Sequence, residues 1–207
     1  MVAPFEGADD RRAVVQLTAT VLPFLALLAV MYRSLVLPYG LTLLLAVPTA
    51  GFLVRVFMVM HDCGHGSFFR SRRANDVVGF AAGVLTLTPY IQWRRDHALH
   101  HASAGDLDRR GHGDVLTLTT LEYGARSRWG RLAYRLYRHP AVMFGLGPLH
   151  LATSQRHSPR GVHRTSVEGR SIRATNVAII LVFGVARHDG RWSRPNRAPS
   201  SVLMGDA

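Results

Sequence analysis

The sequence predicts an all-α membrane protein, in which a transmembrane helical hairpin is followed by interfacial helices that carry clustered histidines. Two apolar runs, at about 13–32 and 35–60, lie almost end to end, and each is long enough for a helix to cross a bilayer, which takes about 20 residues. The second run ends at the first histidine cluster. We therefore assign residues 1–186 to a membrane domain. Residues 187–207, which are polar and rich in arginine and proline, form a predicted disordered tail.

The composition is basic, and its positive charge comes from arginine. The 207 residues include 25 Lys+Arg against 13 Asp+Glu, a formal net charge of +12, and no lysine occurs. Arginines follow the apolar runs closely, as at Arg70, Arg72 and Arg73, and again at Arg94 and Arg95. This arrangement is typical of the cytoplasmic face of a membrane protein. No nucleic-acid recognition motif accompanies the charge, so nucleic acid is not an expected partner.

The positive charges also predict how the hairpin is oriented. Two arginines precede the first apolar run and many follow the second, whereas the turn between the runs holds only Arg33. Because arginine accumulates on the cytoplasmic side, both outer ends of the hairpin should face the cytoplasm. We therefore predict an integral, multi-pass membrane protein with its histidine clusters on the cytoplasmic side. The single cysteine, Cys63, excludes an internal disulfide and fits a reducing compartment.

Four further segments follow the hairpin, and none has the pattern of a clear transmembrane span. Residues 76–92 are apolar but short, and a full crossing there would separate the two histidine clusters, so an interfacial or re-entrant helix is the better interpretation. Residues 102–139 are polar and should be cytoplasmic, partly helical and interfacial. The apolar segments at 140–152 and 175–186 are short for a span. The arginines between them argue against an external loop, so the topology of this region stays open.

Five histidines form two clusters that could bind a metal ion. His61 and His65 are four residues apart, which places both imidazoles on one face of a helix, and His97, His100 and His101 repeat this on a second element. A single pair at this spacing is more often a surface feature than a ligand pair. Two clusters joined by a short segment at a membrane boundary favour a nitrogen-rich site suited to iron, zinc or copper.

The residues around both clusters resemble the membrane fatty acid desaturases. The resemblance extends to about residue 178, is weaker beyond 151, and is closer to acyl-lipid desaturases than to hydroxylases or ketolases. It rests on HDCGH at 61–65 with GSFF at 66–69, on LTLTPY at 85–90, on WRRDHALHH at 93–101 and on GDLDRR at 105–110.

This resemblance implies a non-haem di-iron site that activates O2 and removes two hydrogens from adjacent methylenes of an acyl chain, releasing water. Iron suits this reaction, because a redox-inactive zinc ion cannot become the strong oxidant that an unactivated methylene requires. The resemblance makes all five clustered histidines metal ligands: His61, His65, His97, His100 and His101.

Two aspartates beside the implied ligands could support them. Asp62 and Asp96 would accept hydrogen bonds from imidazole N–H groups, which orients the rings and raises their basicity. A helix-end or solvent-exposed charge explains each aspartate equally well, so both interpretations stay open. Cys63 lies between the two histidines of the first cluster and points off their face. We therefore expect it to be a small packing residue and not a ligand.

The resemblance also implies a set of partners. The substrate would be an acyl lipid or an acyl thioester, with O2 as the second substrate and membrane lipid around the hairpin. Electrons would come from a carrier such as ferredoxin, a flavodoxin-type protein or a cytochrome. Such carriers are commonly acidic and would suit the arginine-rich face.

The sequence departs from the family pattern in its second half. Family members carry a third H-x-x-H-H cluster near the C-terminus, usually after a second membrane hairpin, and neither occurs here. The change near Val185 from an apolar segment to an arginine- and proline-rich tail is what a frameshift would produce. We therefore expect a desaturase that is truncated before the third cluster. Such a chain would hold at most one iron. The family is enzymatic, but the sequence leaves the activity of this chain undecided.

Two alternatives remain beside the desaturase. The first is a catalytically inactive, truncated membrane fragment whose histidine clusters are vestigial. The second is an intramembrane zinc hydrolase, because such enzymes also place H-x-x-x-H on a membrane helix. That motif requires a glutamate after its first histidine as general base. Asp62 stands there instead, and a hydrolase has no use for the second cluster, so this alternative is the weaker one.

Overall fold

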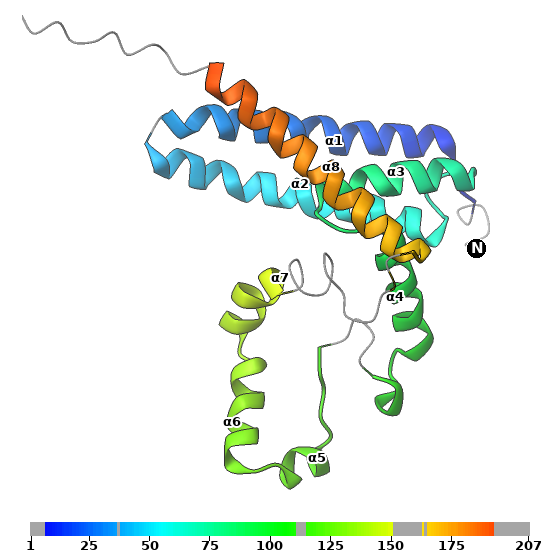
Figure 1. The fold of residues 1–207 in the computed structure, drawn as a ribbon, viewed down its shortest axis with the longest axis vertical. Coiled ribbons are helices and arrows are strands. Elements are labelled where there is room, and N and C mark those ends of the chain that lie inside the picture. The colour runs from blue at the N-terminus through cyan, green and yellow to red at the C-terminus, as the bar shows by residue number, and fades with distance from the viewer. Residues whose placement is uncertain (1–6, 37, 111–114, 151–162, 164, 193–207) are drawn as a thin grey trace, which may run out of the picture.

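The computed structural model describes residues 7–36, 38–110, 115–150, 163 and 165–192. Every regular element in those residues is a helix, and none is a strand. The predicted all-α fold is therefore confirmed. Figure 1 shows long helices packed along one another, and a group of shorter helices that projects from them.

The first two long helices form the predicted hairpin. α1 (Asp10–Arg33) and α2 (Tyr39–His65) pack side by side and are joined through the short helix η2 (Ser34–Val36) (Figure 1). Both helices are long and apolar enough to cross a membrane. Large apolar side chains such as Leu44 and Val47 of α2 are exposed on the outer face of the hairpin. Apolar surface of this extent suits contact with lipid.

Both helices of the hairpin extend beyond the predicted membrane spans, and α2 carries His65 as expected. α1 begins earlier, because the side chain of Asp9 accepts hydrogen bonds from the backbone N–H groups of Arg11 and Arg12 and caps the helix. α2 continues beyond residue 60 to His65 and ends at Gly66, which has a φ of 71°. Glycine adopts this left-handed conformation without the steric cost of a Cβ. Both histidines of the first cluster therefore belong to α2.

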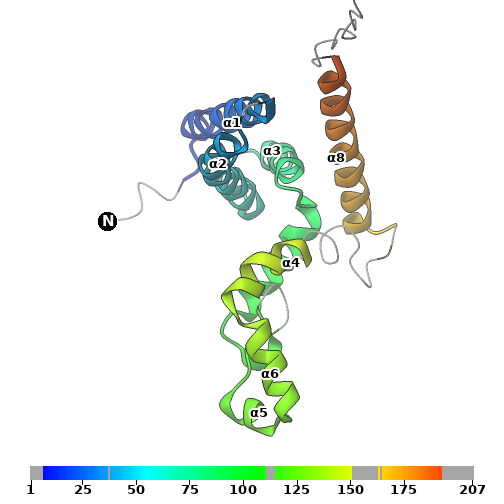
Figure 2. The ribbon, with the colours of Figure 1, turned by 90° about the vertical axis from the view of Figure 1, so that its left-hand side faces the viewer.

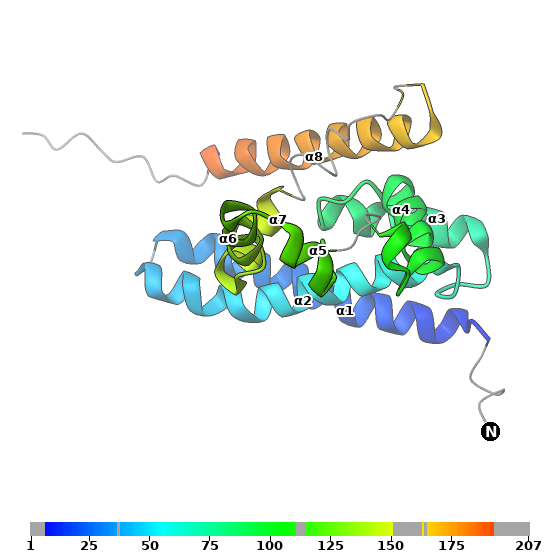
Figure 3. The same ribbon diagram turned by 90° about the horizontal axis from the view of Figure 1, so that it is seen from below.

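The segment between the two histidine clusters contains a break, so residues 76–92 do not form one continuous helix as predicted. α3 (Arg72–Leu85) runs back along α2, and α4 (Tyr90–Ser103) then packs across the end of α2 (Figures 1 and 3). In the turn between them, Leu87 has a φ of 53°. Pro89 disfavours helical conformation in the residue before it, which prevents α3 from continuing into α4.

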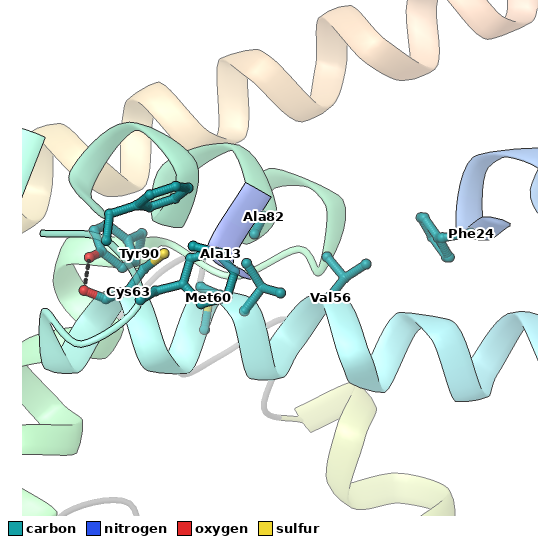
Figure 4. Packing of buried hydrophobic residues seen from close by; sticks show 10 residues of the cluster. Ala13, Phe24, Val56, Met60, Cys63, Ala82 and Tyr90 are labelled. Atoms are coloured by element: carbon teal, nitrogen blue, oxygen red, sulfur yellow. Dashed lines mark hydrogen bonds between the residues drawn. The ribbon is translucent and has the colours of Figure 1, made fainter. Parts of the chain in front are cut away.

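A small apolar core holds α2, α3 and α4 together near the histidines. Val56, Met60 and Cys63 of α2 are almost fully buried, and they pack with Ala82 of α3 and Tyr90 of α4 (Figure 4). The hydroxyl of Tyr90 donates a hydrogen bond of 2.9 Å to the carbonyl oxygen of Cys63. This bond fixes the start of α4 against the last turns of α2.

A later helix, α8 (Val167–Trp192), packs against α3 and α4 and runs back along the hairpin at an angle (Figures 1 and 2). Ser171 is buried in this contact, and its Oγ accepts a hydrogen bond of 3.3 Å from the backbone N–H of Ile91. Arg95 of α4 and Glu168 of α8 form an ion pair at 3.0 Å. The first turns of α8 therefore support α4 on the side of these residues.

Helix α8 contains the start of the predicted tail and the second of the two later apolar segments. The predicted tail, residues 187–207, begins inside α8, because this helix continues to Trp192, and residues 193–207 lie outside the described residues. The apolar segment at 175–186 is part of α8. Shorter helices form the projecting group in Figure 2: η3 (Leu107–Arg109), α5 (Thr120–Ala125), α6 (Arg128–Tyr137), η4 (Val142–Leu146) and α7 (Gly147–His150).

Candidate metal centre

The first histidine pair lies on the last turns of α2. His61 and His65 lie on one face of the helix, with ring centroids 4.6 Å apart and the rings in an edge-to-face arrangement. The backbone N–H of Gly66 donates to the carbonyl oxygen of Cys63, and that of Ser67 donates to Asp62, at 3.0 and 3.1 Å. These bonds satisfy carbonyl groups at the helix end, as expected of a glycine C-cap. The cap therefore keeps His65 within regular helix.

The second cluster reaches the first because α4 packs closely on α2. Trp93 of α4 lies against Gly64, where a Cβ atom would come within 2.8 Å of the Trp93 ring. The same indole stacks on His97, with centroids 4.4 Å apart and planes at 17°, and its centroid is 5.7 Å from that of His61. Neither Trp93 nor Gly64 was among the predicted site residues. The signal in the sequence that could have indicated this contact was the glycine directly before the second histidine of α2.

Four of the five predicted ligands converge on one point. The Nε2 atom of His97 lies 3.1 Å from Nε2 of His61 and 3.2 Å from Nε2 of His65. Nε2 of His101 is 3.0 Å from the same atom of His97. One ligand atom from each of the four rings lies within 4.8 Å of the others. The structure thus brings residues from two helices into a single nitrogen cluster.

This cluster has the geometry of ligands around a metal ion. A neutral imidazole nitrogen either carries one hydrogen or has one lone pair, so Nε2 of His97 cannot form three hydrogen bonds to ring nitrogens at once. A cation between the rings would bind lone pairs that otherwise repel one another. Metal–nitrogen bonds of about 2.1 Å place two nitrogens of the same ion roughly 3.0 to 3.4 Å apart. The observed separations around His97 match this range.

His100 lies outside the four-nitrogen cluster. Its ring centroid is 6.0 Å from that of His97 and 5.8 Å from that of His101. Each residue advances an α-helix by about 100°, so residues 97 and 101 are close together on the helix face while residue 100 is turned away from 101. A ligand role for His100 stays a prediction, because the residues that converge on α2 are His97 and His101.

The two aspartates have different partners. Oδ1 of Asp62 lies 3.1 Å from Nδ1 of His61, which favours a hydrogen on Nδ1 and leaves the Nε2 lone pair facing the cluster. Asp96 accepts a hydrogen bond of 2.8 Å from the side chain of Gln92, one turn earlier on α4. The position of Asp62 fits the predicted supporting role, and Asp96 is oriented by Gln92.

The surroundings of the cluster keep His97 neutral. Burial and the neighbouring imidazoles lower the pKa of His97 from 6.5 to about 4, because both disfavour the protonated ring. Its Nε2 is therefore available as a ligand at neutral pH. His61 and His97 are partly buried, whereas His65 and His101 are exposed. The centre is thus open to solvent on the side of the exposed pair.

In this all-α membrane protein, two helices bring together four imidazoles that could hold a metal ion. A family model for fatty acid desaturases matches residues 34–189, which is most of the chain. The chain is also 44% identical to a fatty acid desaturase of Bacillus subtilis over 189 residues, which cover 88% of this chain and 54% of that protein. The chain therefore belongs to the fatty acid desaturase family.

Other relatives match over shorter stretches. An sn-1 acyl-lipid omega-3 desaturase (ferredoxin) of Synechocystis is 45% identical over 53 residues, which cover 26% of this chain and 15% of the relative. The omega-3 fatty acid desaturase fat-1 of Caenorhabditis elegans is 37% identical over 76 residues, 37% of this chain and 18% of the relative. The chain spans about half the length of the Bacillus relative. No solved structure matches it.

Proposed function

We propose that this chain supplies a four-histidine iron site of a desaturase, which introduces a double bond into a fatty acyl chain with O2. The convergence of the Nε2 atoms of His61, His65, His97 and His101 carries this proposal. Membership of the fatty acid desaturase family supports the reaction type and favours iron as the metal. When bound, iron supplies the oxidising capacity that removal of hydrogen from a methylene requires, which zinc cannot provide.

The residues around the cluster prepare it for a cation. Asp62 holds the Nδ1 hydrogen of His61, so that the opposite nitrogen faces the centre. Trp93 covers one face of His97 and excludes water there. The lowered pKa of His97 keeps its ring uncharged at neutral pH. Together these contacts fix the orientation and protonation of two ligands before any metal binds.

The intramembrane zinc hydrolase is disfavoured by the same geometry. Its general base would have to be Asp62, whose carboxylate already lies at hydrogen-bond distance from His61. A carboxylate occupied in this way is poorly placed to activate a water molecule. The family assignment argues in the same direction.

We also propose the topology and partners that the family suggests. The hairpin would cross the membrane with both outer ends, and the metal centre, on the cytoplasmic side, as the arginine distribution favours. The substrate would be an acyl lipid or an acyl thioester. The Synechocystis relative is named as a ferredoxin-linked acyl-lipid desaturase. An acidic ferredoxin or cytochrome would dock on arginine-rich surface near the centre and deliver electrons.

Metal analysis of the purified chain tests this proposal. The protein is loaded with ferrous iron in detergent without oxygen, freed of excess metal and measured by mass spectrometry. We expect about one iron per chain, since the four convergent nitrogens form one donor set. His97→Ala should abolish binding, while His139→Ala, which changes an exposed histidine outside the cluster, should not. Two irons per chain, or undiminished binding by His97→Ala, would contradict the proposal.

The lipids of an expressing host test the activity of the chain itself. The resemblance implies two irons for the reaction, whereas the convergent residues provide ligands for one ion. We therefore expect iron binding without a new double bond in the host lipids. Gas chromatography of their fatty acids would detect the reaction, and a new unsaturated species dependent on His97 would show that the chain is active.

A further inference from the structure

A cavity lies directly beside the candidate metal centre. It is open, has a volume of about 370 Å³ and is lined by the end of α2, the loop at 66–71, the first turns of α3 and a side chain of α4. His65 forms part of its wall, so the cavity and the metal centre share one residue. The charged residues that line the cavity are Arg70, Arg72, Arg94 and Asp76.

The cavity carries an excess of positive charge. Asp76 forms an ion pair with Arg94 at 2.6 Å, so these two charges offset each other. Arg70 donates from Nε to the carbonyl oxygen of Ala8 at 2.9 Å, and its guanidinium lies within electrostatic reach of Asp9, which offsets part of its charge. Within the part of the chain that the structure describes, no acceptor is bonded to the side chain of Arg72. The charge of Arg72 therefore remains for an anion, part of the charge of Arg70 adds to it, and guanidinium groups suit phosphate oxygens in particular.

Hydrogen bonds of Asn75 hold the backbone that carries Arg70, in the loop at 66–71, and Arg72, at the start of α3. The buried side chain of Asn75 accepts a hydrogen bond from the backbone N–H of Phe69 at 2.9 Å and donates to the carbonyl oxygens of Phe69 and Ser71 at 2.7 and 3.2 Å. Phe68 and Phe69, within the same loop, have buried side chains. Arg70 and Arg72 are thus carried on fixed backbone, and a ligand that binds there does not have to order the loop first.

The cavity lies where both candidate membrane helices end. α2 ends at His65, in its wall. Asp10, the first residue of α1, accepts a hydrogen bond of 2.9 Å from the backbone N–H of Arg70. In a hairpin that crosses the bilayer, its charged ends lie at the level of the lipid headgroups. The anion nearest to the cavity is then a lipid phosphate.

We propose that this cavity, lined by Arg70, Arg72 and Arg94, binds the phosphate of an anionic lipid headgroup at the membrane surface beside the metal centre. The exposed apolar side chains of α2 continue from this end of the hairpin and offer a surface for the acyl chains of the same lipid. The site does not require a bound metal, so it stands or falls independently of the iron site.

Lipid binding by paired arginine variants tests the proposal. Native mass spectrometry counts dioleoylphosphatidylglycerol molecules retained by the full chain in detergent, with dioleoylphosphatidylcholine as the zwitterionic comparison. Arg72→Gln removes a guanidinium from the cavity, whereas Arg73→Gln removes the same charge from its exposed neighbour, which does not line the cavity. We expect about tenfold weaker phosphatidylglycerol binding for Arg72→Gln and less than about twofold for Arg73→Gln. Both variants should keep the circular dichroism of the parent.

Two results would overturn the proposal. Equal losses in the two variants would mean that general surface charge, and not the cavity, attracts the lipid. Inorganic phosphate, added at millimolar concentration, should not displace the lipid if the headgroup and chains bind together. Full displacement by inorganic phosphate would identify a site for free phosphate instead of a lipid.

Discussion

The two helices that form the metal centre hold their histidines in different ways. α2 is a long apolar helix whose buried residues Val56 and Met60 lie just before its histidines. α4 is short and polar, and its position depends on contacts with other elements. Tyr90 fixes its start, and Ser171 of α8 bonds to its first turn. The first histidine pair is therefore placed by its own helix, and the second by tertiary packing.

This difference has a practical meaning for the centre. Changes in α2 that spare its histidines should leave the pair at the same spacing, because helix geometry sets it. Changes in the contacts of α4 should move His97 and His101 relative to α2 without altering α4 itself. Metal affinity then reports how well α4 is docked.

The largest expected effect on metal affinity is the difference between substitutions of the two neighbouring histidines of α4. His101→Ala removes a nitrogen that lies 3.0 Å from that of His97, and we expect roughly a hundredfold loss of metal affinity, at least as large as losses for residues that only support ligands. His100→Ala changes a ring outside the cluster and should cost less than about threefold. Competition with a chelating dye measures both. A larger loss for His100→Ala would mean that α4 turns a different face to the metal.

The next largest loss of metal affinity is expected when the packing of α4 on α3 is disturbed. A Cβ at Gly79 would lie 2.4 Å from the ring of Tyr90, which is buried and cannot move aside freely. Overpacking of this kind costs about 1 to 3 kcal/mol. We therefore expect Gly79→Ala to weaken metal binding about tenfold by displacing α4.

Gly51→Ala is the matched control for that change. Gly51 lies within α2, where an added Cβ meets no atom within 4 Å. Alanine stabilises a helix relative to glycine, so metal affinity should stay at the parent value. If Gly51→Ala and Gly79→Ala were equally harmful, the contact between Gly79 and Tyr90 would not be what positions the second pair.

A smaller effect should distinguish the two aspartates. Asp62→Asn keeps an oxygen that can accept from Nδ1 of His61 but removes the charge that strengthens the bond. We expect about fivefold weaker metal binding, below the usual loss when such a partner is removed entirely. Asp96→Asn alters a carboxylate bonded to Gln92 and should have little effect. Titration of both variants with the same metal decides between them, and the reverse order would assign the supporting role to Asp96.

The same difference between α2 and α4 explains which features could be predicted from the sequence. The apolar runs and the spacing of His61 and His65 are local properties, so the hairpin and the shared face of the first pair followed directly. The break between α3 and α4 depends on the turn before Pro89. The close approach of α4 to α2 depends on the contact between Gly64 and Trp93. Contacts between residues far apart in the chain have no periodic signature.

α8 shows this limit most clearly. From the sequence, its apolar part was predicted as a short, separate segment whose topology stayed open, because it is short for a span and arginines lie between it and the preceding apolar segment. In the structure its polar first turns are the part that contacts the histidine helix, through Ser171 and Glu168. The dependence of α4 on α8 could not be read from either segment alone.

The smallest expected effect tests that dependence. Arg95 and Glu168 form an ion pair between α4 and α8 at 3.0 Å, with the arginine side chain 60% exposed. Solvent screens such a pair, so Arg95→Gln should lower metal affinity by less than about twofold. Ser171→Ala removes the buried acceptor that bonds to Ile91 and should have the larger effect of the two, about threefold. Chelator competition at low and high salt measures both losses. Only the loss in Arg95→Gln should disappear at high salt, and a salt-independent loss there would show that packing of the arginine stem, and not its charge, holds α4 against α8.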